Sequence, residues 1–243
     1  MATSLTYRTP GGQVPAIYLN MLDQAHCLIA GASGSGKSVA INGLIATLLT
    51  KYSPNKAQLV LVDPKRVELA TYAGLPHTIA HWTEPDQIAS GLTSVLDEID
   101  RRYKIAAAQG VRTYQGAHIY VIIDELADLM TTDKKRIQPA LQRIMQIGRA
   151  ALVHVVAATQ CPLASVIPTP IKCNFSGVLG LRTRSAQDSR NILGFNGLET
   201  LPLYGRGIYM APGVQPELIP IRLTSDTEQQ RLIQYWTSDQ CVA

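Results

Sequence analysis

The stretch His26-Cys-Leu-Ile-Ala-Gly-Ala-Ser-Gly-Ser-Gly-Lys-Ser38 joins a short apolar run to a glycine-rich loop. Residues 31–38 fit the pattern G-x-x-x-x-G-K-[ST] at every fixed position. Glycines let the backbone turn so that several N–H groups point inward at phosphate oxygens. Residues 39–52 read as a helix, whose N-terminus would face the same anion. The stretch therefore predicts a strand, a phosphate-binding loop and a helix; the alternative is a glycine-rich turn that binds nothing.

The residues of this loop have distinct expected tasks. Lys37 is expected to reach the β- and γ-phosphates of a nucleotide, and the Ser38 hydroxyl to ligate Mg²⁺. The expected nucleotide-binding residues are Gly31, Ala32, Ser33, Gly34, Ser35, Gly36, Lys37, Ser38 and Val39.

Two adjacent carboxylates, Asp124 and Glu125, follow an apolar strand-like run at residues 119–123. At a strand tip, Asp124 can hold Mg²⁺ through its water shell. Glu125 is then placed to polarise the attacking water as a general base. The alternative is that both acids cap the next helix, because Asp and Glu favour a first turn. Capping and catalysis can also coexist.

Gln160 lies at the end of the next apolar run, residues 153–158. A polar side chain beside the acidic strand tip can contact the γ-phosphate or the lytic water. An amide suits this task because it both donates and accepts hydrogen bonds. The alternative is a polar strand end that makes only local hydrogen bonds.

Short apolar runs alternate with longer helical stretches along the chain, which favours a parallel sheet of βα units. We find no linker, so a single domain over residues 1–243 is expected. Further expected strands are 58–63, 177–181 and a pair at 205–210 and 217–223, and further expected helices are 84–109, 136–151, 185–193 and 225–236.

Composition excludes several classes of protein. With 46% hydrophobic and 16% charged residues, the chain of 243 residues is not intrinsically disordered. Its apolar runs are too short to cross a bilayer, and its polar start lacks a signal-peptide pattern. Its four cysteines form no CxxC pair, which favours free thiols in a reducing cytosol. A cytoplasmic protein without a membrane segment is expected. The net charge of +4 is compatible with nucleic-acid contact along a narrow channel.

Together these motifs resemble the motor domain of the FtsK/SpoIIIE family of DNA translocases, over about residues 13–237. The specific segments are LVLVDPKRVEL (59–69) and VIIDELADLM (121–130), supported by GASGSGKSVAINGLIATLL (31–49), DEIDRRY (97–103), Gly110-Val-Arg112, GRAALVHVVAATQCP (148–162), Lys172 with Asn174, RTRSAQDSRNIL (182–193), Gly205-Arg-Gly207 and TSDTEQQRLIQYW (224–236).

The resemblance implies a RecA-like P-loop NTPase, an α/β fold with a central, mainly parallel sheet and helices on both faces. It implies hydrolysis of ATP, with Mg²⁺, by a hexameric ring that threads double-stranded DNA without reading its sequence. Arg149 aligns with the arginine that the family inserts into the neighbouring subunit's ATP site, so it joins Lys37, Glu125 and Gln160 as an expected catalytic residue. The alternative for Arg149 is pairing with a helix C-terminus. No membrane domain and no C-terminal winged helix are expected.

Basic residues are expected to hold the DNA backbone. Lys172 and Arg190 match family positions, and Arg184 lies near them. Cys161 and Ala186 depart from the family, which usually has Arg and often Lys there.

Other positions carry weaker expectations. Residues 134–136 are a second candidate pore-loop cluster, and Arg206 aligns with a basic position near the nucleotide. Leu152 stands where glycine is usual. Arg101 and Arg102 are expected on a solvated or interfacial helix face with i,i+4 pairs.

The main alternative function is a related ring ATPase that drives conjugative DNA transfer or protein secretion. The ATP site would not separate the two, whereas stimulation by DNA would. A nucleotide-binding assembly protein without turnover and a small-molecule kinase are further alternatives. The intact site argues against the first, and the lack of a lid with paired arginines against the second.

Overall fold

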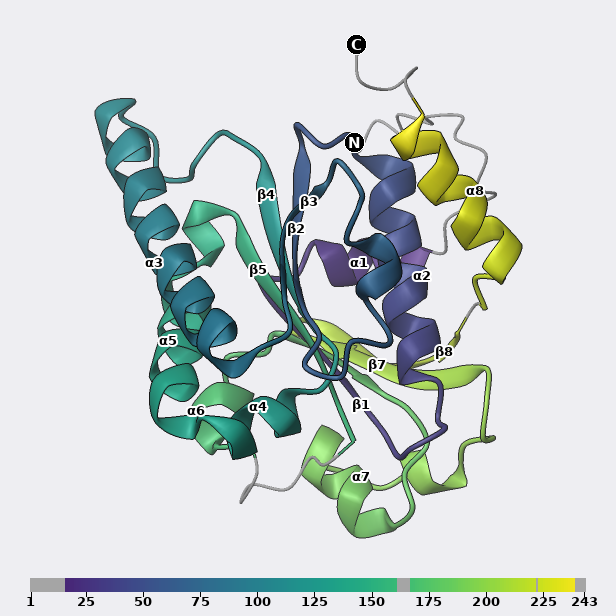
Figure 1. Cartoon of the computed structure of the whole chain (residues 1–243). Coiled ribbons are helices and arrows are strands. Elements are labelled where there is room, and N and C mark those ends of the chain that lie inside the picture. The colour runs from purple at the N-terminus through teal and green to yellow at the C-terminus, as the bar shows by residue number, and fades with distance from the viewer. Residues whose placement is uncertain (1–15, 161–166, 222, 239–243) are drawn as a thin grey trace.

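The computed structural model describes residues 16–160, 167–221 and 223–238 (Figure 1). In this part of the chain eight strands form one sheet, in the order β3-β2-β4-β5-β1-β6-β7-β8. The strands are β1 (His26–Ala30), β2 (Ala57–Val62), β3 (Thr78–Trp82), β4 (His118–Ile123), β5 (Val153–Thr159), β6 (Gly177–Gly180), β7 (Arg206–Ala211) and β8 (Val214–Pro220).

The first six strands in this order are parallel, and β7 and β8 are antiparallel to their neighbours. The central strands are mostly apolar because helices cover both of their faces. Every residue of β1 and β5 is buried. The predicted α/β fold with a mainly parallel sheet is confirmed.

Helices pack on both faces of the sheet (Figure 1). The face of α3 and α5 forms one hydrophobic core, and the face of α1, α2 and α8 forms the other. The helices are α1 (Ala16–Leu22), α2 (Lys37–Lys51), α3 (Pro85–Ala108), α4 (Leu126–Thr132), α5 (Lys134–Ile147), α6 (Thr169–Lys172), α7 (Ala186–Leu193) and α8 (Asp226–Thr237), with short 3₁₀ turns η1 (Ala70–Tyr72), η2 (Arg149–Ala151) and η3 (Leu198–Thr200).

Four details of the sequence-based prediction are wrong. The edge strand β3 was not expected, because its segment TIAHW alternates weakly and stays partly exposed. The expected helix at 136–151 is two elements, α5 and η2. Residues 134–136 form the first turn of α5, so they are not a pore loop. Strand β8 begins at Val214, earlier than expected, because a tight turn at Gly213 (φ 76°) follows β7.

The sequence predicted that Arg101 and Arg102 of α3 share a solvated or interfacial helix face, and the structure separates the two residues. Arg101 is exposed as expected, but Arg102 is only 2% exposed and lies inside the protein. None of the described helices combines the length and the apolarity that a membrane crossing requires.

Candidate nucleotide site

The phosphate loop lies between β1 and α2, held by the end of β5 and by the segment that follows β6. The Gly31 N–H donates to the Thr159 carbonyl (3.2 Å), and the Ala32 N–H donates to the Arg182 carbonyl (2.9 Å). Gly36, with φ at 98°, takes a left-handed conformation that an L side chain rarely adopts. These anchors place the loop at the carboxyl ends of the parallel strands, where such sheets bind ligands.

The side chains of the loop fit an anion. Lys37 Nζ donates to the carbonyls of Gly31 (3.1 Å) and Ala32 (2.8 Å), so its ammonium is held over the loop. Burial lowers the Lys37 pKa, and nearby carboxylates oppose this shift. The Ser35 hydroxyl is buried and has no hydrogen-bond partner among the described residues. Helix α2 begins at Lys37, and no side chain caps its N-terminus. The structure describes the whole first turn of α2, which contains no acidic residue. Its first N–H groups are therefore left for a bound phosphate.

The outer part of the loop is open to solvent. Ser33 and Gly34 are exposed, whereas Ser38 and Val39, in the first turn of α2, are half-buried. The nine expected nucleotide-binding residues therefore form one continuous loop and helix start.

Glu125 joins the acidic strand tip to the neighbouring strand. It is the N-cap of α4, where its Oε1 accepts the Ala127 N–H (3.3 Å). Both of its carboxylate oxygens also accept the Gln160 N–H, at 3.2 and 3.1 Å. Glu125 is only 4% exposed. The capping that was considered as an alternative therefore exists, and it fixes the carboxylate beside the end of β5.

Asp124 lies one residue beyond β4 in a strongly acidic setting. Burial is the main cause that raises its pKa to about 6, and the carboxylates of Glu68, Asp63 and Glu125 add to the rise. A divalent cation would relieve this excess of negative charge.

Asp124 and Ser38 supply hard oxygen ligands, which suit Mg²⁺. Within the described residues no group of three or more His, Cys, Asp or Glu side chains could hold a metal ion. A carboxylate and a hydroxyl fit Mg²⁺, an ion that usually keeps several waters and is bound through one or two carboxylates together with phosphates.

Gln160 lies directly after β5, and its side chain is exposed. The sequence correctly predicted its place beside the acidic strand tip. Its backbone contact with Glu125 was not expected, because sequence patterns carry no information on which N–H group meets a carboxylate across strands.

The turn after β2 adds two residues that sequence reasoning did not assign to the site. Lys65 Nζ lies 3.0 Å from Asp128 Oδ2, and this hydrogen bond is the main cause that raises the Lys65 pKa. Asp63 is fully buried, and its Oδ2 accepts the Leu69 N–H at 3.0 Å. The segment Asp63-Pro-Lys-Arg66 was the available signal, but an Asp-Pro pair also occurs in ordinary turns.

Arg149 lies at the opposite edge of the sheet, in the 3₁₀ turn that precedes β5. It is exposed. The seven residues of β5, at ~3.3 Å per residue, separate it by roughly 20 Å from the strand ends that hold the phosphate loop. Arg149 therefore does not join Lys37 and Glu125 within one chain. Arg206, at the start of the antiparallel β7, is exposed on the phosphate-loop edge.

The expected DNA-binding residues gather around α7. Lys172 Nζ donates to the Asn191 carbonyl, which ties α6 to α7. Arg190 donates to Asn196 Oδ1 (2.7 Å) and to the Gln187 side chain (3.0 Å). Two of the three basic side chains therefore also make local contacts.

The third, Arg184, is exposed just before α7. Ala186 is the first residue of that helix, and Cys161 lies outside the described residues.

Solved structures with a similar fold include ATPases and a conjugation coupling protein. The structure of EssC (ATPases 2 and 3) from Geobacillus thermodenitrificans matches with a TM-score of 0.78 and 18% identity, over 91% of this chain and 46% of that one. The pCW3 conjugation coupling protein TcpA matches with a TM-score of 0.75 and 24% identity, over 88% and 66%. These likenesses confirm the predicted P-loop NTPase fold.

Comparison of sequences gives the family. The chain is 35% identical to "DNA translocase FtsK" of Bacillus cereus over 90% of this chain, and 32% identical to "DNA translocase SpoIIIE" of Bacillus subtilis over 93%. It spans only 30% and 31% of the length of those two relatives. The model of the FtsK/SpoIIIE family matches residues 11–118 and 114–164. Together with the phosphate loop and the acidic strand tip, these matches show that the chain belongs to the FtsK/SpoIIIE family.

Proposed function

We propose that this chain hydrolyses ATP and, as a subunit of a ring, uses the energy to move along double-stranded DNA. One observation carries the ATPase part. Lys37, Asp124 and Glu125 lie at one edge of the sheet, and Glu125 is bonded to the backbone of Gln160. Curated relatives named DNA translocases support the DNA part.

Each residue of the site has a role in this proposal. Lys37 leaves its loop carbonyls to bind the β- and γ-phosphates, and the N–H groups of the loop hold the same oxygens. Ser38 and Asp124 would hold Mg²⁺, which would supply positive charge to neutralise the phosphates when bound. Glu125 orients the attacking water and takes its proton, and the Gln160 amide contacts that water or the γ-phosphate.

Arg149 acts on the neighbouring subunit in this proposal. Arg149 is exposed, and the length of β5, at ~3.3 Å per residue, separates its backbone by roughly 20 Å from its own phosphate loop. In a ring, with six subunits expected, it would reach the ATP bound next door and stabilise charge that develops on the transferred phosphoryl group. Loss of such a residue typically lowers the rate ~10³–10⁵-fold.

DNA would pass the basic side chains around α7, namely Lys172, Arg184 and Arg190. Contacts of Lys and Arg with phosphates carry no sequence information, so binding would be independent of sequence and would weaken with salt. Cys27 and Cys173 are free thiols, which suits the reducing cytoplasm that we propose as the location.

The test is steady-state ATP hydrolysis with and without long linear duplex DNA, with Lys37→Ala as the blank. Strong stimulation by duplex DNA is expected. Hydrolysis that is abolished by Lys37→Ala but ignores DNA would refute the DNA part. It would favour the related ring ATPases that serve conjugation or secretion.

The role of Arg149 in a neighbouring site is tested by mixing subunits. Arg149→Ala should bind ATP and barely hydrolyse it. Mixed with Lys37→Ala subunits, it should regain activity, because some interfaces then pair an intact ATP site with an intact Arg149. No recovery at any mixing ratio would contradict action between subunits.

A further inference from the structure

We propose that Arg102 is a positioning residue that fixes the turn carrying Arg149, and so presents the Arg149 guanidinium to the neighbouring subunit. This inference rests on the proposed role of Arg149 between subunits. It concerns a residue in α3, far along the chain from the turn, whose local sequence suggested a solvated or interfacial helix face.

The turn at residues 147–152 joins α5 to β5, and all six of its carbonyls accept hydrogen bonds. Three of the donors come from α3 or from the loop that follows it, so the turn is held from outside as well as by its own backbone. The bonds are Tyr103 hydroxyl to Ile147 (2.6 Å), Ala151 and Val153 N–H to Gly148 (3.0 and 2.9 Å), Leu152 N–H to Arg149 (3.2 Å), Tyr114 N–H to Ala150 (2.9 Å), Arg102 Nη1 to Ala151 (2.8 Å) and Ile119 N–H to Leu152 (2.9 Å).

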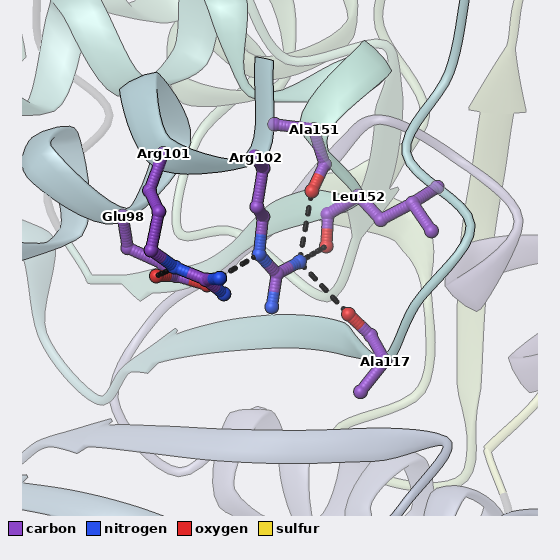
Figure 2. A network of polar contacts seen from close by, with 6 residues as sticks. All are labelled: Glu98, Arg101, Arg102, Ala117, Ala151 and Leu152. Carbon is purple, nitrogen blue, oxygen red and sulfur yellow. Dashed lines mark hydrogen bonds and ion pairs between the residues drawn. The ribbon is translucent and has the colours of Figure 1, made fainter. Parts of the chain in front are cut away.

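Arg102 connects three segments through one buried guanidinium (Figure 2). Its Nη1 donates to the carbonyls of Ala151 and Ala117, both at 2.8 Å. Its Nε donates to Glu98 Oε1 at 2.7 Å, within α3. The guanidinium also lies 4.6 Å from the centroid of the Tyr114 ring, a cation–π contact. The rigid fork of an arginine can make these contacts together, whereas a single ammonium cannot.

The turn needs such support because its backbone is crowded and strained. Leu152 has φ at 57°, a left-handed conformation that is unfavourable for a residue with a Cβ. A Cβ at Gly148 would lie 2.7 Å from the carbonyl oxygens of Ile144 and Val153. Strained backbone of this kind persists only where the surroundings over-determine it, and it gathers at functional sites.

Arg149 is the part of this turn that is left free. Within the described residues, its side chain makes no hydrogen bond or ion pair, and it is exposed. A rigid backbone beneath a free guanidinium limits the directions in which that group can reach. This is what pre-organisation of a transition-state contact requires.

The adjacent Arg101 provides a matched control (Figure 2). It binds the same carboxylate, through Nε to Glu98 Oε2 (2.6 Å) and Nη2 to Oε1 (2.8 Å). Hydrogen bonds from Arg101, the larger cause, and from Arg102 lower the Glu98 pKa to about 2. Arg101 is exposed, and within the described residues it donates no hydrogen bond to the turn. Arg101→Gln therefore removes the same charge and a bond to the same partner without releasing Arg149.

The experiment measures kcat and KM for ATP in the full chain with duplex DNA present. Arg102→Gln and Arg101→Gln are made alone and together with Arg149→Ala, and residual rates are followed by release of labelled phosphate. We expect Arg102→Gln to lower kcat on the order of 10²-fold, a typical result of a misplaced catalytic group, with KM unchanged. Arg101→Gln should leave both unchanged. In the Arg149→Ala background, Arg102→Gln should cause no further loss.

Two outcomes would overturn the inference, and a third would refute the proposed role of Arg149 on which it rests. An equal loss of kcat from Arg102→Gln in the native and Arg149→Ala backgrounds would mean that Arg102 acts through general packing and not through Arg149. Equal kcat and KM values for Arg102→Gln and Arg101→Gln would mean that the hydrogen bonds from Arg102 to the turn do not position Arg149. Full activity of Arg149→Ala would instead refute the proposed role of Arg149 itself, which separates the two failures.

If Arg102→Gln does not fold, Tyr103→Phe replaces it, because that change removes only the hydroxyl donor to Ile147. The same comparison across backgrounds then applies, with a smaller loss expected. Equal loss in both backgrounds would again overturn the inference.

Discussion

The first prediction concerns His26, a buried histidine whose two hydrogen bonds specify its protonation state. His26 Nε2 lies 2.8 Å from the Met145 carbonyl, so it must carry a proton and donate. His26 Nδ1 accepts the Val155 N–H at 3.0 Å, so it must be unprotonated. The ring therefore joins β1 to β5 and α5 only as the neutral imidazole. Burial lowers its pKa to about 4 from an ordinary value of 6.5.

This pKa shift makes stability depend on pH with a definite sign. Below pH 6.5 the unfolded chain binds a proton at His26, while the folded chain does so only near pH 4. The free energy of unfolding therefore falls as pH decreases through this window, by up to ~1.4 kcal/mol per pH unit. Over the whole window the loss from His26 alone is ~3 kcal/mol, a large fraction of typical domain stability.

The assay is urea unfolding of the native chain and of His26→Gln at several pH values between about 7.5 and 4. The variant should be less stable at neutral pH, and its deficit should shrink by ~3 kcal/mol toward pH 4, because it has no imidazole to protonate. Contributions from the other titrating groups cancel in the difference between the unfolding free energies of the native chain and of the variant. A deficit that stays constant with pH would refute the reasoning, since His26 would then titrate alike in both states.

A second buried histidine provides an independent check of the same argument. Burial lowers the pKa of His154 to about 4, and its Nδ1 donates to the Gln24 carbonyl at 3.0 Å. The deficit of His154→Gln should shrink with falling pH in the same direction.

Three further predictions use backbone and packing. Gly91→Ala would place a Cβ 2.3 Å from the Trp82 ring and should cost ~1–3 kcal/mol in urea unfolding; Gly74→Ala, which meets open space, is the control, and equal effects would contradict the predicted clash. Glu125→Gln should abolish hydrolysis and also lower stability by ~1–3 kcal/mol, because both carboxylate oxygens accept backbone N–H groups; unchanged stability would mean that the cap contributes nothing. Gly36→Ala forces a side chain into φ 98° and should weaken ATP binding in a titration by ~1–2 kcal/mol, roughly tenfold; unchanged affinity would show that the loop tolerates the strain.

Much of the architecture could be predicted from the order of motifs. An apolar strand, a glycine-rich loop and a helix define the first βα unit, and the later apolar strands extend the parallel sheet. The edge strand β3 was missed because its side chains are only partly buried and show no clear period. The helix break at Gly148 was missed because the helical periodicity of α5 continues past it in the sequence.

The nucleotide site was predicted better than the contacts around it. Lys37, Glu125 and Gln160 were placed at one edge, because parallel strands bring their carboxyl ends together. Lys172 was expected to hold the DNA backbone, and the structure adds that its ammonium donates to the Asn191 carbonyl. A partner 19 residues away in the chain leaves no trace in local sequence.

The sequence by itself determined the phosphate loop, the acidic strand tip and the parallel sheet, because glycine conformations and hydrophobic spacing act over neighbouring residues. Tertiary structure decided that Arg102 is buried while the adjacent Arg101 is exposed. The segment DEIDRRY contains no signal that distinguishes the two arginines, so both were expected on one helix face. The carbonyls of Ala117 and Ala151, 15 and 49 residues further along the chain, help to make the burial of Arg102 favourable. A buried charge is stable only with partners, and the fold supplies those partners from distant segments.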